Sequence, residues 1–192
     1  MQAPELTREL KSKAEQLGFQ LSGACAAVQP TGLHQFFDWL DEGYAGTMHY
    51  LSDRRDAYAH PNHVLENTRS LLVLAMHYGQ GTPEPPQVGK GRVASYAWGT
   101  TDYHDLIHKR LKQLKQFHQQ LVPDQQCRGV VDTAPLLEKD FAQRAGIGWI
   151  GKNTLLINRT QGSYFFLAVL LTTAELSYDQ PMERDHCGGC TA

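Results

Sequence analysis

Apolar residues along the chain recur in two patterns: the three-to-four-residue spacing of helices and the short continuous runs of buried strands. Near the start, Leu6, Leu10 and Ala14 share one helical face. Gly18 then supplies a stop signal, so a helix is predicted over residues 5–17.

The same reasoning divides the rest of the chain. Further helices are predicted from residue 31 to the break at Gly43, and over residues 102–121 and 135–145. Strands are predicted over residues 19–28, 70–77, 92–97, 127–131, 154–157 and 164–172, the last two as a hairpin around 158–162. The run 70–77 is continuously apolar, which is typical of a strand buried on both faces. Residues 79–91 are rich in glycine and proline and are predicted to form a loop.

Strands and helices alternate first, and a hairpin closes the pattern. This order predicts an α/β (α+β) fold with a mixed central sheet flanked by helices. The 192 residues are 41% hydrophobic and 20% charged, as in a globular domain, which excludes a disordered chain. No apolar run approaches the roughly 18 residues of a membrane span, and the polar start does not resemble a secretory signal.

Charge and cysteine content narrow the function classes. A net charge of -2 lacks the basic footprint of a dedicated nucleic-acid binder. Four basic residues on one helix could still form a local patch, although such residues more often form a solvated helix face: Lys109, Arg110, Lys112 and Lys115. The chain has four cysteines, too few for a disulfide scaffold, which favours a reducing cytoplasm.

A glycine-rich stretch over residues 146–153 reads GIGWIGKN and matches two nucleotide-binding patterns. Gly146, Gly148 and Gly151 fit GxGxxG, and the stretch is one substitution from a P-loop. Both patterns require a strand before and a helix after the loop, whereas here a helix precedes and a strand follows. A nucleotide site is therefore disfavoured. The stretch could be a tight turn, or could wrap another ligand with backbone N–H groups.

Asp132 follows the apolar residues 129–131 at a predicted strand end, in VVDTAP. A carboxylate at such a position is a common acid or base. The alternative is a turn or cap residue before the next helix.

Other polar and aromatic residues have two interpretations each. His104 could be a ligand or proton shuttle, or a surface residue at a helix start. Tyr96 and Trp98 could line a planar cofactor or lie in the core. Arg54 and Arg55 could meet an anion or pair with neighbouring aspartates.

Cys187 and Cys190 form a CxxC close to the last residue given. A thioredoxin-like pair would need a strand before it and a helix after it. A zinc site would need two further ligands. An iron–sulfur cluster would need more cysteines at short spacing, and this motif would be the beginning of such a run.

Four segments together resemble the epoxyqueuosine reductase family, over nearly the whole chain. They are SYAWGTTDYHDLIHKRL (95–111), VDTAPLLEKDFAQRAGIGWIGKNTLLI (131–157), GSYFFLAVLLTT (162–173) and HCGGC (186–190). The resemblance implies a nitroreductase-like, cobalamin-binding module over residues 1–178. Residues 179–192 would then begin a truncated ferredoxin-like domain, and the chain would be an N-terminal fragment.

The resemblance also implies an activity, the reduction of epoxyqueuosine to queuosine in the wobble position of tRNA. Base-off cobalamin would be the cofactor, reduced through two [4Fe–4S] clusters that this chain does not complete. Electrons would come from a flavodoxin- or ferredoxin-type protein. We expect a cytoplasmic monomer that makes no membrane contact and is inactive without its iron–sulfur domain.

The family pattern assigns the role of proton donor to Asp132. Cys187 and Cys190 would be partial [4Fe–4S] ligands. The residues implied to contact cobalamin or its pocket are Arg55, Ser95, Tyr103, His104, Gly148, Ile150, Lys152, Asn153, Thr154, Leu156 and Leu167. Two other functions stay open: a corrinoid-binding or processing module without clusters, and a flavin-dependent nitroreductase-like enzyme.

Overall fold

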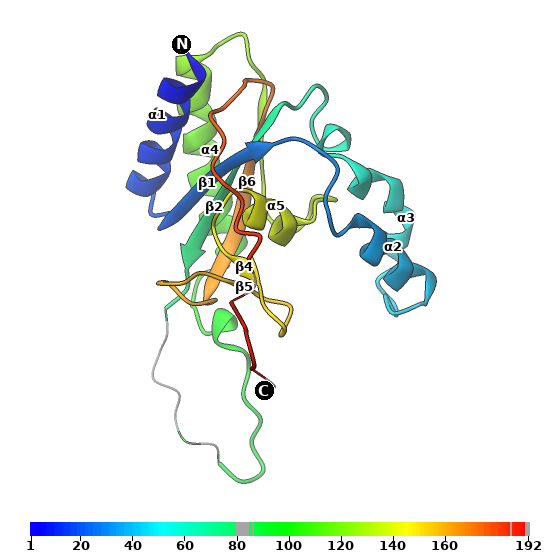
Figure 1. The fold of residues 1–192 in the computed structure, drawn as a ribbon. Helices are drawn as coiled ribbons and strands as arrows, with labels where there is room; N and C mark the ends of the chain where they lie inside the picture. Colours follow the sequence, from blue (N-terminus) through cyan, green and yellow to red (C-terminus); the bar gives the residue numbers. More distant parts are fainter. Residues whose placement is uncertain (80–84, 86, 185, 191–192) are drawn as a thin grey trace.

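The computed structural model describes residues 1–79, 85, 87–184 and 186–190. Its centre is a four-stranded sheet in the order β1-β2-β6-β3 (Figure 1). The strands are β1 (Leu21–Ala26), β2 (Ser70–His77), β3 (Cys127–Val130), β4 (Trp149–Ile150), β5 (Leu156–Ile157) and β6 (Phe165–Thr172). The α-helices are α1 (Ala3–Gln16), α2 (Leu33–Asp41), α3 (His49–Asp53), α4 (Tyr103–Leu121) and α5 (Glu138–Arg144). Short 3-10 turns are η1 (Arg55–Ala59), η2 (Pro61–His63) and η3 (Ser95–Ala97).

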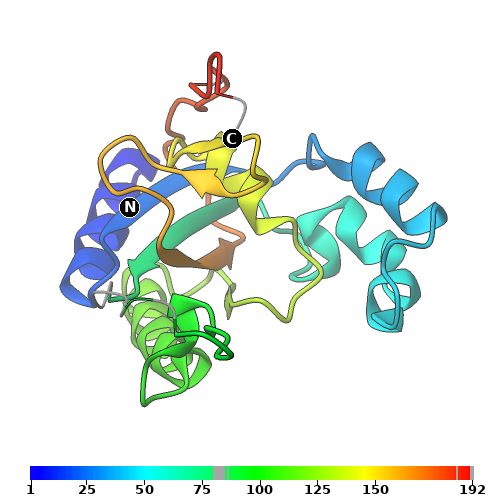
Figure 2. The same ribbon diagram turned by 90° about the horizontal axis from the view of Figure 1, so that it is seen from below.

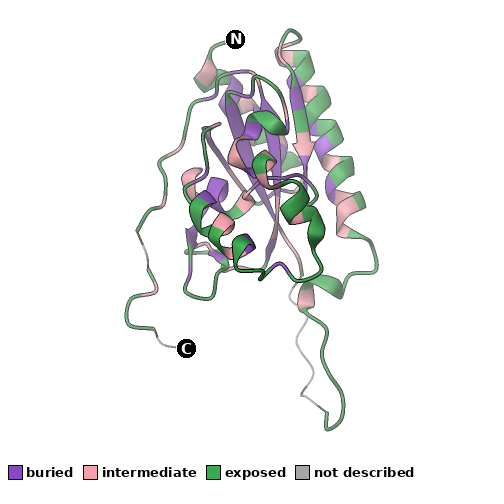
Figure 3. Cartoon of the chain, turned by 90° about the vertical axis from the view of Figure 1, so that its right-hand side faces the viewer, coloured by how far each residue is buried: buried purple, intermediate pink, exposed green. Residues whose placement is uncertain are grey.

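The central strand β2 is buried on both faces, as its continuous apolar sequence predicts. Leu72 and Leu74 face α1 and α4, in a core that includes Ile107. Leu71 and Val73 face the opposite side, where α5 packs. Figure 3 shows the buried strands between helices whose outer faces are exposed. The predicted central sheet with helices on its faces is therefore confirmed.

Three local predictions are wrong. The described pairs of the central sheet are all antiparallel, so the sheet is not mixed. Residues 92–97 form no strand: Val93 is 67% exposed, and residues 95–97 form η3. Strand β5 pairs with β4 instead of forming a hairpin with β6, although the turn Asn158–Gly162 is bridged as predicted.

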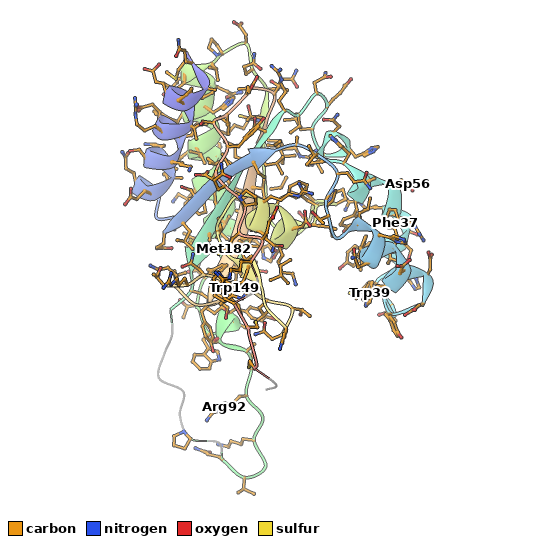
Figure 4. The ribbon with its side chains drawn as sticks, in the orientation of Figure 1. Phe37, Trp39, Asp56, Arg92, Trp149 and Met182 are labelled. Atoms are coloured by element: carbon orange, nitrogen blue, oxygen red, sulfur yellow. The ribbon has the colours of Figure 1, made fainter. Side chains whose placement is uncertain are left out.

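Residues 33–63 form an arm, made of α2, α3, η1 and η2, beside the sheet (Figures 1 and 2). Rings hold it together: the Phe36 and Tyr58 centroids are 4.7 Å apart. Arg55 lies over the ring of Phe37 at 4.4 Å and forms an ion pair with Asp41. Figure 4 shows Phe37 on this arm. Arg55 therefore has local partners that account for its position.

The segment after β6 returns along the edge strand β1. The backbone N–H of Asp179 donates to the Ala24 carbonyl at 2.9 Å, and its carboxylate accepts from the Ala24 N–H at 2.7 Å. Lys11 completes the contact with an ion pair to Asp179 at 2.6 Å. Covering this edge satisfies backbone groups that an open sheet would leave exposed. No helix among the described residues is long and apolar enough to cross a membrane.

His118 on α4 predicts a pH dependence of stability. Burial lowers its pKa from 6.5 to about 4, and Nε2 lies 2.7 Å from Thr172 Oγ1. Below pH 6.5 the His118 side chain binds a proton in the unfolded chain, whereas in the folded chain it binds one only near pH 4. The unfolding free energy should therefore fall by up to about 3 kcal/mol as pH drops through this window, at about 1.4 kcal/mol per pKa unit.

Urea unfolding at several pH values checks this expectation. His118→Leu should flatten the acid slope, whereas His108→Leu, an exposed site on the same helix, should leave it unchanged. Equal slopes in the two variants would contradict the assignment to His118.

Candidate active site

An acidic site lies directly after β3. Asp132 has φ +52°, the left-handed region that non-glycine residues rarely occupy. The Thr133 N–H donates to the Val131 carbonyl at 2.5 Å and closes a tight turn centred on Asp132. Such strain persists where the surrounding structure holds it, often at functional positions. Asp132 caps no helix, since α5 begins at Glu138 with Leu137 as its N-cap residue.

Two neighbours from the first turn of α4 hold the Asp132 carboxylate. The Tyr103 hydroxyl donates to Asp132 Oδ2 at 2.5 Å, and His104 Nε2 lies 3.2 Å from the same oxygen. On its other side, His104 Nδ1 lies 2.9 Å from Asp102 Oδ1. As predicted, Asp102 caps α4 by accepting from the His104 N–H at 2.8 Å. His104 is therefore a bridge between two carboxylates.

The bridge can move a proton. Hydrogen bonds from the backbone N–H and ring of His104 keep the pKa of Asp102 below its usual range, so Asp102 stays ionised. An ionised acceptor at Nδ1 favours the tautomer that carries its proton there. Nε2 is then free to exchange a proton with Asp132.

Tyr103 is fixed between aromatic rings. Its centroid lies 3.9 Å from that of Phe166, with the planes 7° apart, and 4.0 Å from that of His104. Burial and the hydrogen bond to Asp132 raise the pKa of Tyr103 well above its usual range. The hydroxyl therefore stays protonated and serves Asp132 as a hydrogen-bond donor.

Asp132 opens into a cavity of about 340 Å³ with mostly aromatic walls. Its lining residues are Tyr78, Tyr96, Tyr103, Asp132, Glu138, Lys139, Phe165, Phe166 and Leu167. A second cavity of about 680 Å³ shares four of these residues and extends past Ser95 and Arg110. Arg110 donates to the Gly18 carbonyl at 3.1 Å, so it does not belong to a fully solvated basic face.

Glu138 is a second acid in the smaller cavity. Burial, with a smaller contribution from the charge of Asp132, raises its pKa from 4.5 to about 8. Its Oε1 is buried and has no hydrogen-bond partner among the described residues. At neutral pH the Glu138 side chain is therefore a neutral carboxylic acid.

The glycine-rich stretch forms the turn from α5 into the β4–β5 hairpin. A Cβ on Gly148 would lie 2.3 Å from the Ile157 carbonyl oxygen, so only glycine allows this approach. The N–H groups of Gly151 and Thr154 donate within the turn, at 2.9 Å each. A helix precedes and a strand follows, as predicted, which removes the nucleotide interpretations.

The hairpin is tied to two other segments. Lys139 Nζ donates to the Thr154 carbonyl at 2.8 Å, which joins the hairpin to α5. Lys152 Nζ donates to the Gly188 carbonyl at 2.9 Å and to the Cys190 carbonyl at 2.8 Å. The CxxC segment therefore lies against this hairpin, near Trp149 in Figure 4. Among the described residues, no three His, Cys, Asp or Glu side chains form a metal-binding group.

The predicted site residues lie in five places. Tyr103, His104, Asp132 and Leu167 meet at the smaller cavity, and Ser95 lines the larger one. The hairpin carries Gly148, Ile150, Lys152, Asn153, Thr154 and Leu156, of which Leu156 is buried in the core. Arg55 lies on the arm, and Cys187 and Cys190 lie beyond the hairpin.

The residues of the smaller cavity that sequence reasoning missed are Tyr78, Glu138, Lys139, Phe165 and Phe166. Glu138 lies six residues after Asp132 in the most specific matching segment, which could have drawn attention to it. An acid in the first turn of a helix is common, however, and its burial is not visible in the sequence.

Comparison with known proteins shows which family the chain resembles. A family model described as "Epoxyqueuosine reductase QueG, DUF1730" matches residues 59–133. An epoxyqueuosine reductase of Pseudomonas aeruginosa is 39% identical over 191 residues, covering 97% of this chain and 53% of that protein. The protein of the same name from Escherichia coli K12 is 36% identical over 98% of this chain and 50% of its own length. The chain thus spans about half the length of these curated relatives.

Solved structures described as epoxyqueuosine reductases are also similar to this chain. An epoxyqueuosine reductase bound to an epoxyqueuosine-modified tRNA stem loop has a TM-score of 0.86 and 26% identity, over 97% of this chain and 50% of that one. The Bacillus subtilis enzyme, described with a catalytic aspartate loop swung out of the active site, has a TM-score of 0.83 and 25% identity over the same shares.

A reductive dehalogenase described as B12-dependent shares the fold alone, with a TM-score of 0.59 and 19% identity over 100% of this chain and 23% of that one. In sequence and in fold, the chain is therefore similar to the epoxyqueuosine reductases over about half of their length.

Proposed function

We propose that this chain is the cobalamin-binding part of an enzyme that reduces epoxyqueuosine in tRNA to queuosine. The observation that carries the proposal is the strained Asp132, held by Tyr103 and His104 beside an aromatic cavity. The names of the relatives and the tRNA stem loop bound to one of them support this substrate. The catalytic aspartate loop of the Bacillus subtilis enzyme supports the role of Asp132.

The two adjoining cavities fit a large, flat cofactor with a polar rim. Aromatic walls from Tyr78, Tyr96 and Phe166 suit the face of a corrin ring. His77 lines the larger cavity, and its buried Nε2 has no hydrogen-bond partner among the described residues, so it is available to a polar ligand. The fold shared with a B12-dependent dehalogenase points to the same cofactor class. Bound base-off, cobalamin would supply a strongly reducing cobalt centre.

The chain's own residues would supply orientation and protons. Removing an epoxide oxygen as water requires an acid that donates to that oxygen, and we assign this role to Asp132. Tyr103 would hold the Asp132 carboxyl in position through its hydroxyl. His104, which touches both Asp132 and the ionised Asp102, would return a proton to Asp132 after turnover.

Other parts of the proposal concern regions outside this cavity. Residues 1–178 would be the cobalamin-binding domain, and Cys187 and Cys190 would contribute to a [4Fe–4S] cluster. The hairpin residues Gly148–Thr154 would lie at the rim of the corrin. Electrons would arrive from a flavodoxin- or ferredoxin-type protein in the cytoplasm.

Titration of the purified chain with hydroxocobalamin tests the cofactor. We expect a base-off absorbance spectrum, and we expect Phe166→Ala to weaken binding at least about tenfold, or about 1.4 kcal/mol. Phe37→Ala, which changes an aromatic residue on the arm, is the matched control and should bind normally. A copurifying flavin without any cobalamin-induced spectral change would instead favour a nitroreductase-like enzyme.

A further inference from the structure

The proposed reaction needs two protons, whereas Asp132 carries one. Converting an epoxide to an alkene breaks both C–O bonds, consumes two electrons and releases the oxygen as water. The electrons come from the reduced cobalamin that the proposed function requires. The oxygen must collect two protons, so a second acid should lie near Asp132. This inference therefore rests on the proposed function.

The other groups at the cavity are poor sources of that second proton. The Tyr103 hydroxyl is engaged with Asp132 and, with its pKa raised, holds its proton. Burial also raises the pKa of Tyr78. The two ring nitrogens of His104 already contact Asp102 and Asp132. Lys139 Nζ already donates a hydrogen bond to the Thr154 carbonyl.

Glu138 is a better source of the second proton than these groups. It lines the same 340 Å³ cavity as Asp132, from the first residue of α5. Its Oε1 is buried without a hydrogen-bond partner among the described residues, so a proton on this oxygen is not already donated to a neighbouring group. The charged and titratable groups around it are Asp132 and Lys139, with Tyr58 on η1 also within electrostatic range.

We propose that Glu138 is the second proton donor of this site, which protonates the epoxide oxygen after Asp132 and so completes the leaving water. Each donor loses one proton per turnover and regains it from solvent, Asp132 through His104. Because burial keeps Glu138 protonated up to about pH 8, the acid is ready at neutral pH. Activity should therefore fall as pH rises through this value.

The first test needs no cofactor or substrate. In ¹³C NMR of the chain labelled at the glutamate carboxyl carbons, one signal should titrate near pH 8 and disappear in Glu138→Gln. In Asp132→Asn, its midpoint should move to lower pH, because a negative charge that favours the protonated form is gone. A Glu138 signal that titrates near 4.5 would overturn the proposal.

The second test measures single-turnover conversion of an epoxyqueuosine-modified tRNA stem loop by the chain with cobalamin. Titanium(III) citrate supplies the electrons in place of the iron–sulfur domain. Glu138→Gln should lower the rate about a hundredfold and remove the loss of activity above pH 8. Glu138→Asp, which keeps an acid, should recover part of the rate. Glu42→Gln, at an exposed position on the arm, is the matched control and should behave as the unchanged chain.

The outcomes separate the two claims. If Asp132→Asn abolishes turnover while Glu138→Gln keeps the unchanged rate and pH profile, the Glu138 proposal is wrong and the proposed function stands. If the unchanged chain binds cobalamin but forms no product, the proposed function fails, and the role of Glu138 fails with it.

Discussion

Asp132→Asn is expected to lower the rate of epoxide reduction by about a hundredfold or more, as removal of a general acid does. The amide has nearly the shape of the carboxyl and can still accept from the Tyr103 hydroxyl at the same position. It cannot give up a proton to the epoxide oxygen. The loss should therefore appear in the rate of the chemical step, with cobalamin and stem-loop affinities close to unchanged.

Single-turnover kinetics at saturating stem loop separate these quantities. Asp124→Asn is a matched control, because it removes one carboxylate from an exposed loop after α4. Tyr103→Phe should give an intermediate loss, since Asp132 keeps its acid but loses the donor that holds it. A full rate for Asp132→Asn would exclude Asp132 as the proton donor.

The geometry around Asp132 explains why the conservative change Asp132→Asn should lower the reaction rate so strongly. The left-handed turn at Asp132 is fixed from several sides: α4 supplies Tyr103 and His104, and Arg54 on the arm donates to the Thr133 carbonyl at 3.1 Å. Holding a reactive group within a fraction of an ångström preserves the high effective concentration that exact positioning provides. The arm thus contacts the site through Arg54, whereas Arg55 contacts Asp41 and Phe37 on the arm itself.

Helices and strands could be predicted where the local sequence pattern itself shows which residues are buried. The apolar run of β2 is buried on both faces because it is the central partner of β1 and β6. The long helix α4 begins at its Asp102 cap and ends at Leu121, as its spacing and cap predict. The position of Asp132 just after a strand could be predicted from the apolar residues before it.

Features that depend on a distant partner could not be predicted. Residues 92–97 have strand-like composition, but no sheet edge receives them, and Val93 stays exposed. Strand β5 pairs with β4 because Gly148 lets the backbone approach Ile157, a contact that no local pattern contains. The raised pKa of Glu138 likewise results from burial among residues far along the chain.

Gly148→Ala is expected to cost about 2 to 3 kcal/mol of unfolding free energy, the upper range for overpacking. The new Cβ would lie 2.3 Å from the Ile157 oxygen and 2.8 Å from its carbonyl carbon. Both are backbone atoms, so the hairpin itself must move. It is also joined to α5 through Lys139, and α5 carries Glu138. Displacing the hairpin should therefore weaken cobalamin binding as well as stability.

Urea unfolding and hydroxocobalamin titration of the same variant measure the two effects. Gly189→Ala is the matched control: nothing lies within 4 Å of its added Cβ, and it should change neither quantity. A Gly148→Ala chain with unchanged stability would contradict the close packing at Ile157. One with reduced stability but unchanged cobalamin affinity would place the cofactor away from the hairpin. Gly148 therefore fixes the position of the hairpin relative to the cavity, and Gly148→Ala disturbs this connection between the fold and the site.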